Sequence, residues 1–517
     1  MAVAVAPRTL PSAPARQAAP PALAVRLAVG GAVAAAYALV GARLVIGLDA
    51  VSPEAVARLA RAYLVWHGAV PKLAALGFSV PPLGGLALTP LAGPAGLAGS
   101  LVALPVFGGL CGGVTVVALD RTLARCGLNS VRRIPLVAAF ALNPLVAFQF
   151  TTGTTAALEL ALLAVALRGL VGWGAGADPR ALLGAGVGFA GLVLTRYELA
   201  AWALVAGLMV VEALTVNDAE PAEVEGSATA FWAPTVAALA AWTLIGAVIV
   251  DSAFGWARHA WSDESVGALS ATDAAHKVGE LALQAYPLAF LAVAALLGLR
   301  AARRDAVAGG LAALIAVGAL VAAVHAYAAD ATGPVALETG PSLLLASLAG
   351  AGWAIRDAGA RRAWFWWATL AVLVVGGGAA WRALDHYPYQ SGERAWARAL
   401  RTGDDQGTTA DARRIAGALR AAAPRRARVL ADEDGAGAAI LLSKRAGAFV
   451  TRAGAGAERW DAALHAPARR VDYLLAARGD AVDRGRPGLL GGRDRSALVI
   501  AAAGPYVLAR VLPARGP

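Results

Sequence analysis

Two polar sites interrupt the long apolar stretches of this chain, and their residue types suit chemistry on a lipid-borne substrate. Asp49 directly follows the first apolar stretch, where an ionised carboxylate at a membrane interface is solvated and still faces the space between helices. This placement suits a base that takes a proton from an acceptor. The alternative is an interfacial carboxylate that only ends a helix. Glu54 shares the segment and is a further substrate-binding candidate; the alternative is a structural role, because its spacing from Arg58 predicts an i,i+4 ion pair.

The second polar site is the run Thr195-Arg196-Tyr197-Glu198 between two apolar stretches. The planar guanidinium of Arg196 is suited to clamp a phosphate, with Tyr197 and Glu198 as further substrate-binding candidates. The alternative is a simple ion pair of Arg196 with Glu198 in an interfacial loop. Two more carboxylates, Glu159 and Glu338, fall inside apolar stretches. A charge there costs about 2 to 3 kcal/mol or more, so each is expected to face a cavity or a partner.

The sequence contains no metal or nucleotide motif. His259 and His276 share a loop with several carboxylates, but no spacing there matches a metal site. Cys111 and Cys126 form neither a C-x-x-C motif nor two pairs, so neither a disulfide framework nor a zinc site is indicated. The run 432–437 (Asp-Glu-Asp-Gly-Ala-Gly) lacks a third glycine, and its three carboxylates would repel phosphate. No cofactor is evident; a divalent metal is compatible with phosphate chemistry, but no residue pattern supports one.

The composition places these residues in a membrane protein. The chain is 58% hydrophobic and only 15% charged, with a mean hydropathy of +0.62, which is too apolar for a soluble globule. Charge is concentrated at the end of the chain, since residues 385–517 hold 22 of the 45 Lys and Arg and 14 of the 34 Asp and Glu. Nucleic-acid binding is excluded as a function, because most Arg flank apolar stretches or lie in this tail instead of forming a stripe with aromatics.

The apolar stretches predict about eleven transmembrane helices, each needing about 20 residues. The first runs over residues 23–48, which is too long for a signal peptide. Arg-rich loops alternate along the chain and predict a cytoplasmic N-terminus, in a multi-pass protein of the cell membrane. The predicted parts are a disordered cytoplasmic segment at 1–22, a transmembrane domain at 23–384 with long outer loops at 49–82 and 251–280, and an extracytoplasmic domain at 385–517.

The first outer loop contains a predicted helix that starts at Ser52 and Pro53. Charged residues line one face and apolar residues the other, which is typical of an amphipathic helix lying on the membrane surface. The alternative is an ordinary packed loop helix. The following stretch, with Pro90 and Pro94, predicts a juxtamembrane or re-entrant element instead of a full crossing.

The tail alternates helical and strand-like segments, which predicts a small α/β domain. The predicted helices are Asp411–Ala421, Ala436–Ser443 and Trp460–His465, and the strand-like segments are Arg428–Ala431 and Ala448–Thr451. Apolar runs follow at Val471–Leu475, Leu498–Ala501 and Tyr506–Leu512.

Several short runs, taken in order, resemble bacterial membrane proteins of the glycosyltransferase C superfamily (GT-C), which includes protein O-mannosyltransferases and lipid A aminoarabinose transferases. The matching runs are Asp49-Ala50-Val51-Ser52, Ala62-Tyr63, Leu73-Ala74-Ala75-Leu76-Gly77-Phe78, Pro82-Leu83, Ala141-Leu142-Asn143-Pro144 and Leu194-Thr195-Arg196-Tyr197-Glu198. The tail resembles the α/β domain that closes many of those chains.

The resemblance implies a GT-C-like polytopic fold and a sugar carried on a polyprenyl phosphate as donor. It implies transfer of that sugar to a hydroxyl acceptor of the cell envelope, with Asp49 as the general base and Arg196 stabilising the leaving phosphate. Membrane lipids are the other expected partners. Two other functions remain open: a transporter or flippase for lipid-linked sugars, and a non-enzymatic envelope protein that binds a partner through its outer domain.

Overall fold

The structure is a computed structural model of the 517-residue chain. It describes residues 23–69, 73–77, 81–250, 282–328, 332–386, 391–452 and 456–513, with the single positions 272, 276 and 279. The predicted disordered segment 1–22, most of the predicted outer loop 251–280 with His259, and the side chain of Glu338 lie outside the described residues.

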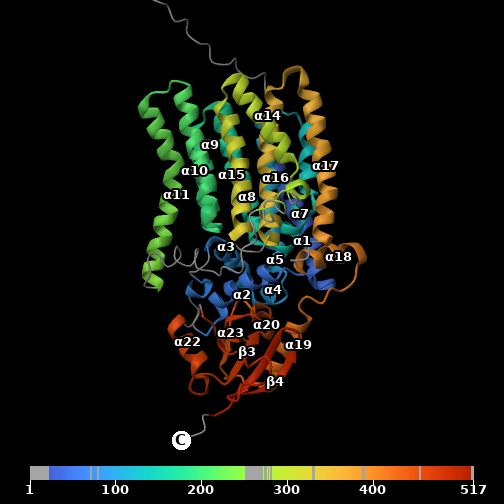
Figure 1. The fold of residues 1–517 in the computed structure, drawn as a ribbon, viewed down its shortest axis with the longest axis vertical. Helices are drawn as coiled ribbons and strands as arrows, with labels where there is room; N and C mark the ends of the chain where they lie inside the picture. Colours follow the sequence, from blue (N-terminus) through green and yellow to red (C-terminus); the bar gives the residue numbers. More distant parts are fainter. Residues whose placement is uncertain are drawn as a thin grey trace, which may run out of the picture.

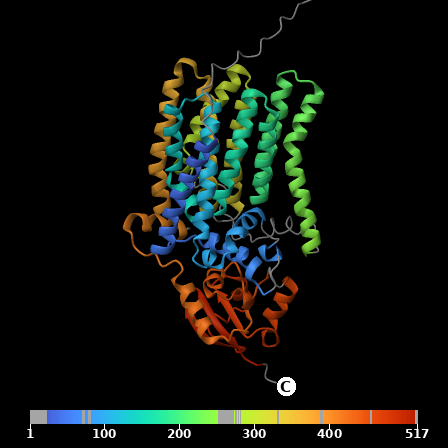
Figure 2. The same ribbon diagram turned by 180° about the vertical axis from the view of Figure 1, so that it is seen from behind.

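Apolar helices form an upright bundle (Figures 1 and 2). The first predicted span, residues 23–48, coincides with α1. The bounds are α1 Leu23–Gly47, α5 Ala103–Arg125, α6 Ser130–Ala141, α7 Pro144–Thr152, α8 Thr155–Gly176, α9 Pro179–Thr195, α10 Ala200–Val216, α11 Pro221–Val250, α14 Leu288–Arg303, α15 Ala306–Ala328, α16 Thr332–Asp357 and α17 Arg362–His386.

Seven helices among the described residues are long and apolar enough to cross a membrane, and the bent pair makes an eighth candidate. The bend of 65° between α6 and α7 has a local cause, because Asn143 caps α7 through the Leu145 amide and Pro144 cannot continue α6. The shorter apolar helices include α9, with 17 residues. These helices confirm the predicted polytopic α-helical membrane fold.

Small residues bring α1 and α5 into backbone contact. A Cβ atom on Gly109 would lie 2.4 Å from the carbonyl oxygen of Ala34, and one on Gly113 would lie 2.4 Å from that of Gly30. Glycine is therefore required at both positions for this approach. Close helix contact through small residues is typical of membrane helices, where dispersion replaces the hydrophobic driving force.

The Arg-rich loops gather at the end of the bundle that lies away from the tail domain (Figure 1). Arg362 donates to the carbonyl oxygen of Gly127 at 2.6 Å, and Trp366 Nε1 donates to that of Arg132 at 2.8 Å. Arg303 pairs with Asp357 at 3.3 Å. We call this the basic end of the bundle and the other the domain-side end.

A layer of short helices covers the domain-side end. It consists of α2 Pro53–His67, η1 Leu73–Leu76, α3 Leu83–Ala92 and α4 Ala95–Gly99. Both faces of α2 are packed: Val56, Leu59 and Tyr63 are buried, and Arg61 pairs with Asp434 of the tail domain. These contacts favour the packed loop helix, because an amphipathic pattern also suits a helix between two domains. A position of α2 at the membrane surface stays a prediction. Pro53 is at the first helical position, but the Ser52 side chain makes no capping hydrogen bond.

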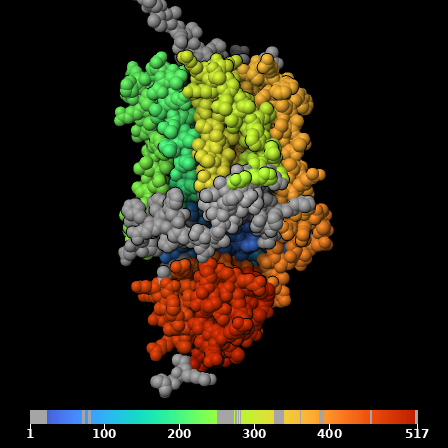
Figure 3. All heavy atoms as spheres, in the orientation of Figure 1, coloured from blue at the N-terminus to red at the C-terminus, as the bar shows by residue number. Residues whose placement is uncertain are grey.

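The tail folds into a small α/β domain, which appears as a separate red lobe in Figure 3. Its sheet has the order β2-β1-β3-β5-β4, in which β2, β1 and β3 are parallel and the last two pairings are antiparallel. The elements are α18 Ser391–Thr402, α19 Ala410–Ala422, β1 Val429–Ala431, α20 Gly437–Ser443, η4 Ala446–Ala448, β2 Phe449–Val450, α22 Ala457–His465, η5 Pro467–Arg469, β3 Tyr473–Ala477, α23 Ala481–Gly485, β4 Ala497–Ala503 and β5 Tyr506–Val511.

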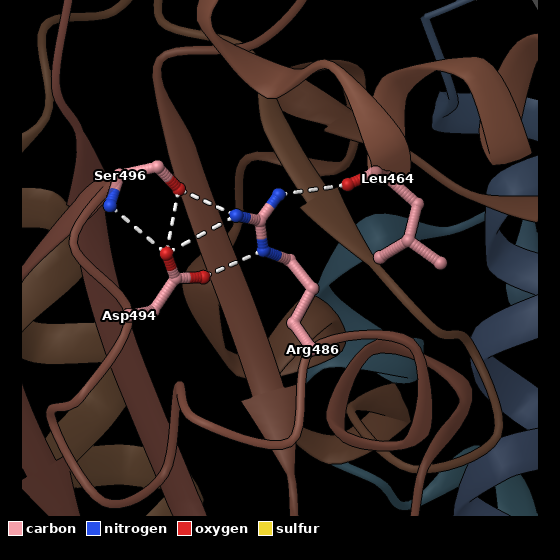
Figure 4. Close-up of polar contacts among 4 residues, drawn as sticks. All are labelled: Leu464, Arg486, Asp494 and Ser496. Atoms are coloured by element: carbon pink, nitrogen blue, oxygen red, sulfur yellow. Dashed lines mark hydrogen bonds and ion pairs between the residues drawn. The ribbon is translucent and has the colours of Figure 1, made fainter.

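One polar cluster ties the loop before β4 to the end of α22 (Figure 4). Arg486 binds the Asp494 carboxylate through Nε at 2.6 Å and Nη2 at 3.1 Å, and its Nη1 donates to the carbonyl oxygen of Leu464 at 2.9 Å. Burial would raise the pKa of Asp494, but hydrogen bonds from Arg486 and Ser496 outweigh it and lower the pKa to about 2. The cluster therefore stays charged near neutral pH and fixes this loop.

Candidate functional site

Charged side chains collect at the domain-side end of the bundle, where it meets α2 and α3. The break between α9 and α10 supplies part of this set: α9 ends at Thr195, Arg196 is extended, and a short 3-10 turn, η2 Tyr197–Leu199, leads into α10. The N-terminal half of α8 supplies Glu159. Helix α2 supplies Glu54 and Arg58. Elements far apart in the sequence thus bring their charges to one region.

Arg196 lies between two carboxylates. Its Nε donates to Glu198 Oε1 at 2.6 Å, and its Nη1 is 3.8 Å from Glu159 Oε2. The side chain of Glu159 is only 3% exposed and that of Arg196 13%, so this ion pair is largely shielded from water. Tyr197 is held separately, because its hydroxyl accepts a hydrogen bond from Trp242 Nε1 at 3.1 Å. The predicted need of Glu159 for a partner is met by Arg196.

Glu54 and Arg58 form the predicted i,i+4 pair at 3.0 Å. Their charges also reach Glu159, so the two ion pairs belong to one electrostatic cluster. A further carboxylate, Glu393 on α18, lies near Glu54. Its burial, with the charge of Glu54, raises its pKa to about 7. We call Glu54, Arg58, Glu159, Arg196 and Glu198 the charged cluster.

Asp49 lies in a junction with the tail domain. Its carboxylate accepts hydrogen bonds from the backbone amide of Thr409 at 2.9 Å and from the Thr409 hydroxyl at 2.6 Å. Arg413 Nη1 is 3.2 Å from Asp49 Oδ2, and the whole Asp49 residue is 3% exposed. The backbone of Asp49 has φ 41°, a left-handed conformation that costs energy for a residue other than glycine.

Backbone hydrogen bonds extend this junction on both sides of Asp49. The Gln406 amide donates to the carbonyl oxygen of Leu48 at 2.8 Å, and the Thr408 amide donates to that of Asp49 at 3.1 Å. The amide of Val51 donates to the Thr408 hydroxyl at 3.2 Å. We call residues 48–51 together with 406–409 the Asp49 junction. Asp49 contacts Thr409 and Arg413 of the tail domain, whereas Arg196 contacts Glu159 and Glu198 in the bundle, so these two predicted site residues lie in different environments.

The acidic run 432–434 makes structural contacts. Asp432 Oδ2 accepts from the amide of Ala481, Glu433 accepts from the amide of Arg452, and Asp434 pairs with Arg61. These bonds hold the loop after β1 against α23, β2 and α2. Among the described residues, no group of three or more His, Cys, Asp or Glu side chains has the geometry to hold a metal ion.

Thr409 and Arg413 gave no signal in the sequence, because they lie about 360 residues from Asp49 along the chain. Arg58 was noted only as the partner of Glu54. Thr155 stands at the start of α8 and faces the same region, and it too was missed. In the sequence, Thr155 directly precedes the apolar stretch that contains Glu159, and this position could have identified it.

No family model and no curated protein matches this sequence. Among solved structures, the chain is similar to ArnT from Cupriavidus metallidurans, whose crystal structure is bound to undecaprenyl phosphate. The TM-score is 0.56 at 14% identity, and the match covers 96% of this chain and 100% of that chain. At this identity the likeness shows the fold, and the predicted architecture, a polytopic helical bundle with a small C-terminal α/β domain, is confirmed.

Proposed function

We propose that this protein transfers a sugar from a polyprenyl-phosphate donor to a hydroxyl acceptor. The observation that carries the proposal is the shielded guanidinium of Arg196, which lies with Glu159 and Glu198 at one end of an apolar bundle. A lipid phosphate keeps its tail in the bilayer and brings its anionic head to this level. The likeness in fold to ArnT, which binds undecaprenyl phosphate, supports the same class of donor.

In the proposed reaction, Asp49 takes the proton of the acceptor hydroxyl as that oxygen attacks the anomeric carbon of the sugar. The bond between this carbon and the phosphate oxygen breaks, and polyprenyl phosphate leaves with its charge stabilised by Arg196. General-base help of this kind contributes roughly 10²- to 10⁴-fold. Asp49 accepts three contacts from Thr409 and Arg413, so one of its about four lone-pair positions is left for an acceptor.

Glu198, Tyr197 and Glu54 are proposed to act at the donor end of the site. Glu198 and Glu54 each hold one guanidinium, so their role is to orient Arg196 and Arg58 toward the phosphate. The Tyr197 hydroxyl, which accepts a hydrogen bond from Trp242, is proposed to donate its proton to a sugar or phosphate oxygen when the donor binds.

The direct test is transfer by the purified, full-length protein reconstituted in lipid vesicles. Polyprenyl phosphates bearing different radiolabelled sugars are supplied with a mixture of envelope glycolipid and peptide acceptors. We expect label to move from one donor class to an acceptor, with release of polyprenyl phosphate. Movement of intact donor across the bilayer without release would instead support a flippase, and inactivity over the whole panel would contradict the proposal.

Orientation is the second part of the proposal: the basic end lies in the cytoplasm and the tail domain outside. Arg-rich loops lie preferentially in the cytoplasm, and those of this chain share the end of the bundle away from the tail domain. A phosphatase reporter that is active only outside the cytoplasm, fused after Thr402, is expected to be active. The same reporter fused after Arg304 is the matched control and is expected to be silent. The reverse pattern would place the charged cluster in the cytoplasm.

A further inference from the structure

The start of helix α8 carries a buried threonine hydroxyl. Thr155 is 5% exposed, and its Oγ1 atom has no hydrogen-bond partner among the described residues. A buried hydroxyl left in this state is costly compared with one that is bonded. The preceding residue, Thr154, does not cap the helix. Its hydroxyl donates to Gln149, and its side chain makes no hydrogen bond to the backbone amides of α8. The N-terminus of a 22-residue helix is therefore without a side-chain cap.

Helix α3 passes this helix end with a glycine. Gly84 is buried, and a Cβ atom there would lie 3.3 Å from Thr155 Oγ1 and 2.8 Å from Arg58 Nη1. A side chain at this position would clash with Arg58, so the glycine allows the Arg58 guanidinium and the Thr155 hydroxyl to lie together against α3. The Arg58 side chain is 29% exposed, so it can move to admit a ligand.

The polar groups that meet beside Gly84 are hydrogen-bond donors. Thr155 offers its hydroxyl, α8 offers its first backbone amides with the positive end of the helix dipole, and Arg58 offers Nη1. The nearest carboxylates are directed elsewhere: Glu54 binds Nη2 of Arg58, and Glu159 pairs with Arg196 about one helical turn further along α8. A ligand that only accepts hydrogen bonds and carries negative charge complements such a set.

From this geometry we infer that Thr155, Arg58 and the N-terminus of α8, opposite Gly84, form a binding site for the phosphate group of a polyprenyl phosphate. The inference rests on the proposed function and extends it, because it assigns the phosphate to residues other than Arg196. Arg196, which pairs with Glu159, keeps its proposed role of stabilising the charge of the leaving phosphate.

The test measures binding without turnover. The full-length protein in detergent is titrated with undecaprenyl phosphate, with a polyprenol of equal length and with inorganic phosphate, and binding is followed by tryptophan fluorescence. Thr155→Val keeps the shape and removes only the hydroxyl, Gly84→Ala places a methyl group against Arg58 and Thr155, and Arg58→Gln removes the charge. Thr89→Val is the matched control, because its hydroxyl is already bonded to the carbonyl oxygen of Gly85 in α3.

We expect Thr155→Val and Arg58→Gln to weaken binding of undecaprenyl phosphate about tenfold or more, and Gly84→Ala to do so by obstruction. Polyprenol should bind weakly to every variant, and Thr89→Val should bind as the wild type does. Thr155→Val should keep the melting temperature of the unliganded protein, because the lost hydroxyl had no partner in the described structure.

Wild-type affinity in Thr155→Val and Arg58→Gln would overturn the site, and so would polyprenol binding as tight as that of the phosphate. If inorganic phosphate bound as tightly as the lipid and with the same sensitivity to the variants, the anion site would stand and the lipid source would be wrong. If the variants lost binding of undecaprenyl phosphate but the wild type transferred no sugar, the binding site would be supported and the proposed function contradicted. The two proposals can therefore fail separately.

Discussion

Asp49→Asn is expected to reduce sugar transfer by roughly 10²- to 10⁴-fold, the range expected when a general base is removed. An amide has nearly the shape of a carboxylate but cannot take the acceptor proton. Its oxygen still accepts from one donor of Thr409, whereas its NH₂ group cannot accept from the other. The measurement is initial-rate transfer by the reconstituted protein over a range of acceptor concentrations, with donor binding measured in parallel.

The Asp49 junction makes a stability control essential. The variant leaves one donor of Thr409 without its acceptor, which costs about 1 to 3 kcal/mol, and it also removes the charge that pairs with Arg413. Arg413→Gln removes the same ion pair and keeps the Asp49 carboxylate. It is therefore expected to reproduce part of the stability loss and to retain far more transfer than Asp49→Asn.

Arg414→Gln is the matched surface control, because Arg414 pairs with Asp411 on the exposed side of the same helix. It is expected to change neither melting temperature nor transfer measurably, since exposed pairs contribute about 0 to 1 kcal/mol. Full transfer by a folded Asp49→Asn protein would show that Asp49 serves only the junction. The base would then have to be another carboxylate, and Glu159 in the charged cluster would be the first to test.

Most of the fold could be predicted because its causes are local in the sequence. Each membrane helix is an apolar run of suitable length, and the segments of the tail alternate in ways that specify their own secondary structure. The helix predicted at Asp411–Ala421, for example, is α19, Ala410–Ala422. The ion pair of Glu54 with Arg58 followed from helical spacing alone.

What could not be predicted depends on contacts between distant segments. The charged and apolar faces of α2 suit a membrane surface as well as a domain interface, and the sequence alone does not show that the tail domain packs against this helix. The Asp49 junction joins residues about 360 positions apart, so no spacing rule reveals it. Arg196 and Glu159 were each identified as candidates, but their pairing depends on the packing of α8 against α9.

Arg196→Met is expected to have the second largest effect, on both stability and transfer. It removes the cation beside Glu159, whose side chain is 3% exposed. Breaking a buried pair by removing one partner costs about 3 to 5 kcal/mol, because the remaining charge stays in a poorly solvated site. The variant should therefore melt several degrees lower in detergent than the wild type, and it should lose transfer because the leaving phosphate has lost its guanidinium.

Arg300→Met is the matched control for stability. Arg300 pairs with Glu212 near the basic end of the bundle, where both side chains are more than one-third exposed. The same substitution at a solvated pair should cost no more than about 1 kcal/mol and leave transfer intact. A comparable drop in melting temperature for both variants would contradict the claim that burial makes the Arg196 pair different.

A second substitution separates the two effects of Arg196→Met. Glu159→Gln replaces the buried carboxylate with a neutral amide, so the double variant Glu159→Gln/Arg196→Met contains no unpaired buried charge at this pair. We expect it to recover most of the melting temperature lost in Arg196→Met, giving an interaction term of roughly 0.5 to 3 kcal/mol in the double-mutant cycle. Transfer should stay low, because the guanidinium needed by the phosphate is still missing. If transfer returned together with stability, Arg196 would be a structural partner of Glu159 and the phosphate would have to be stabilised elsewhere.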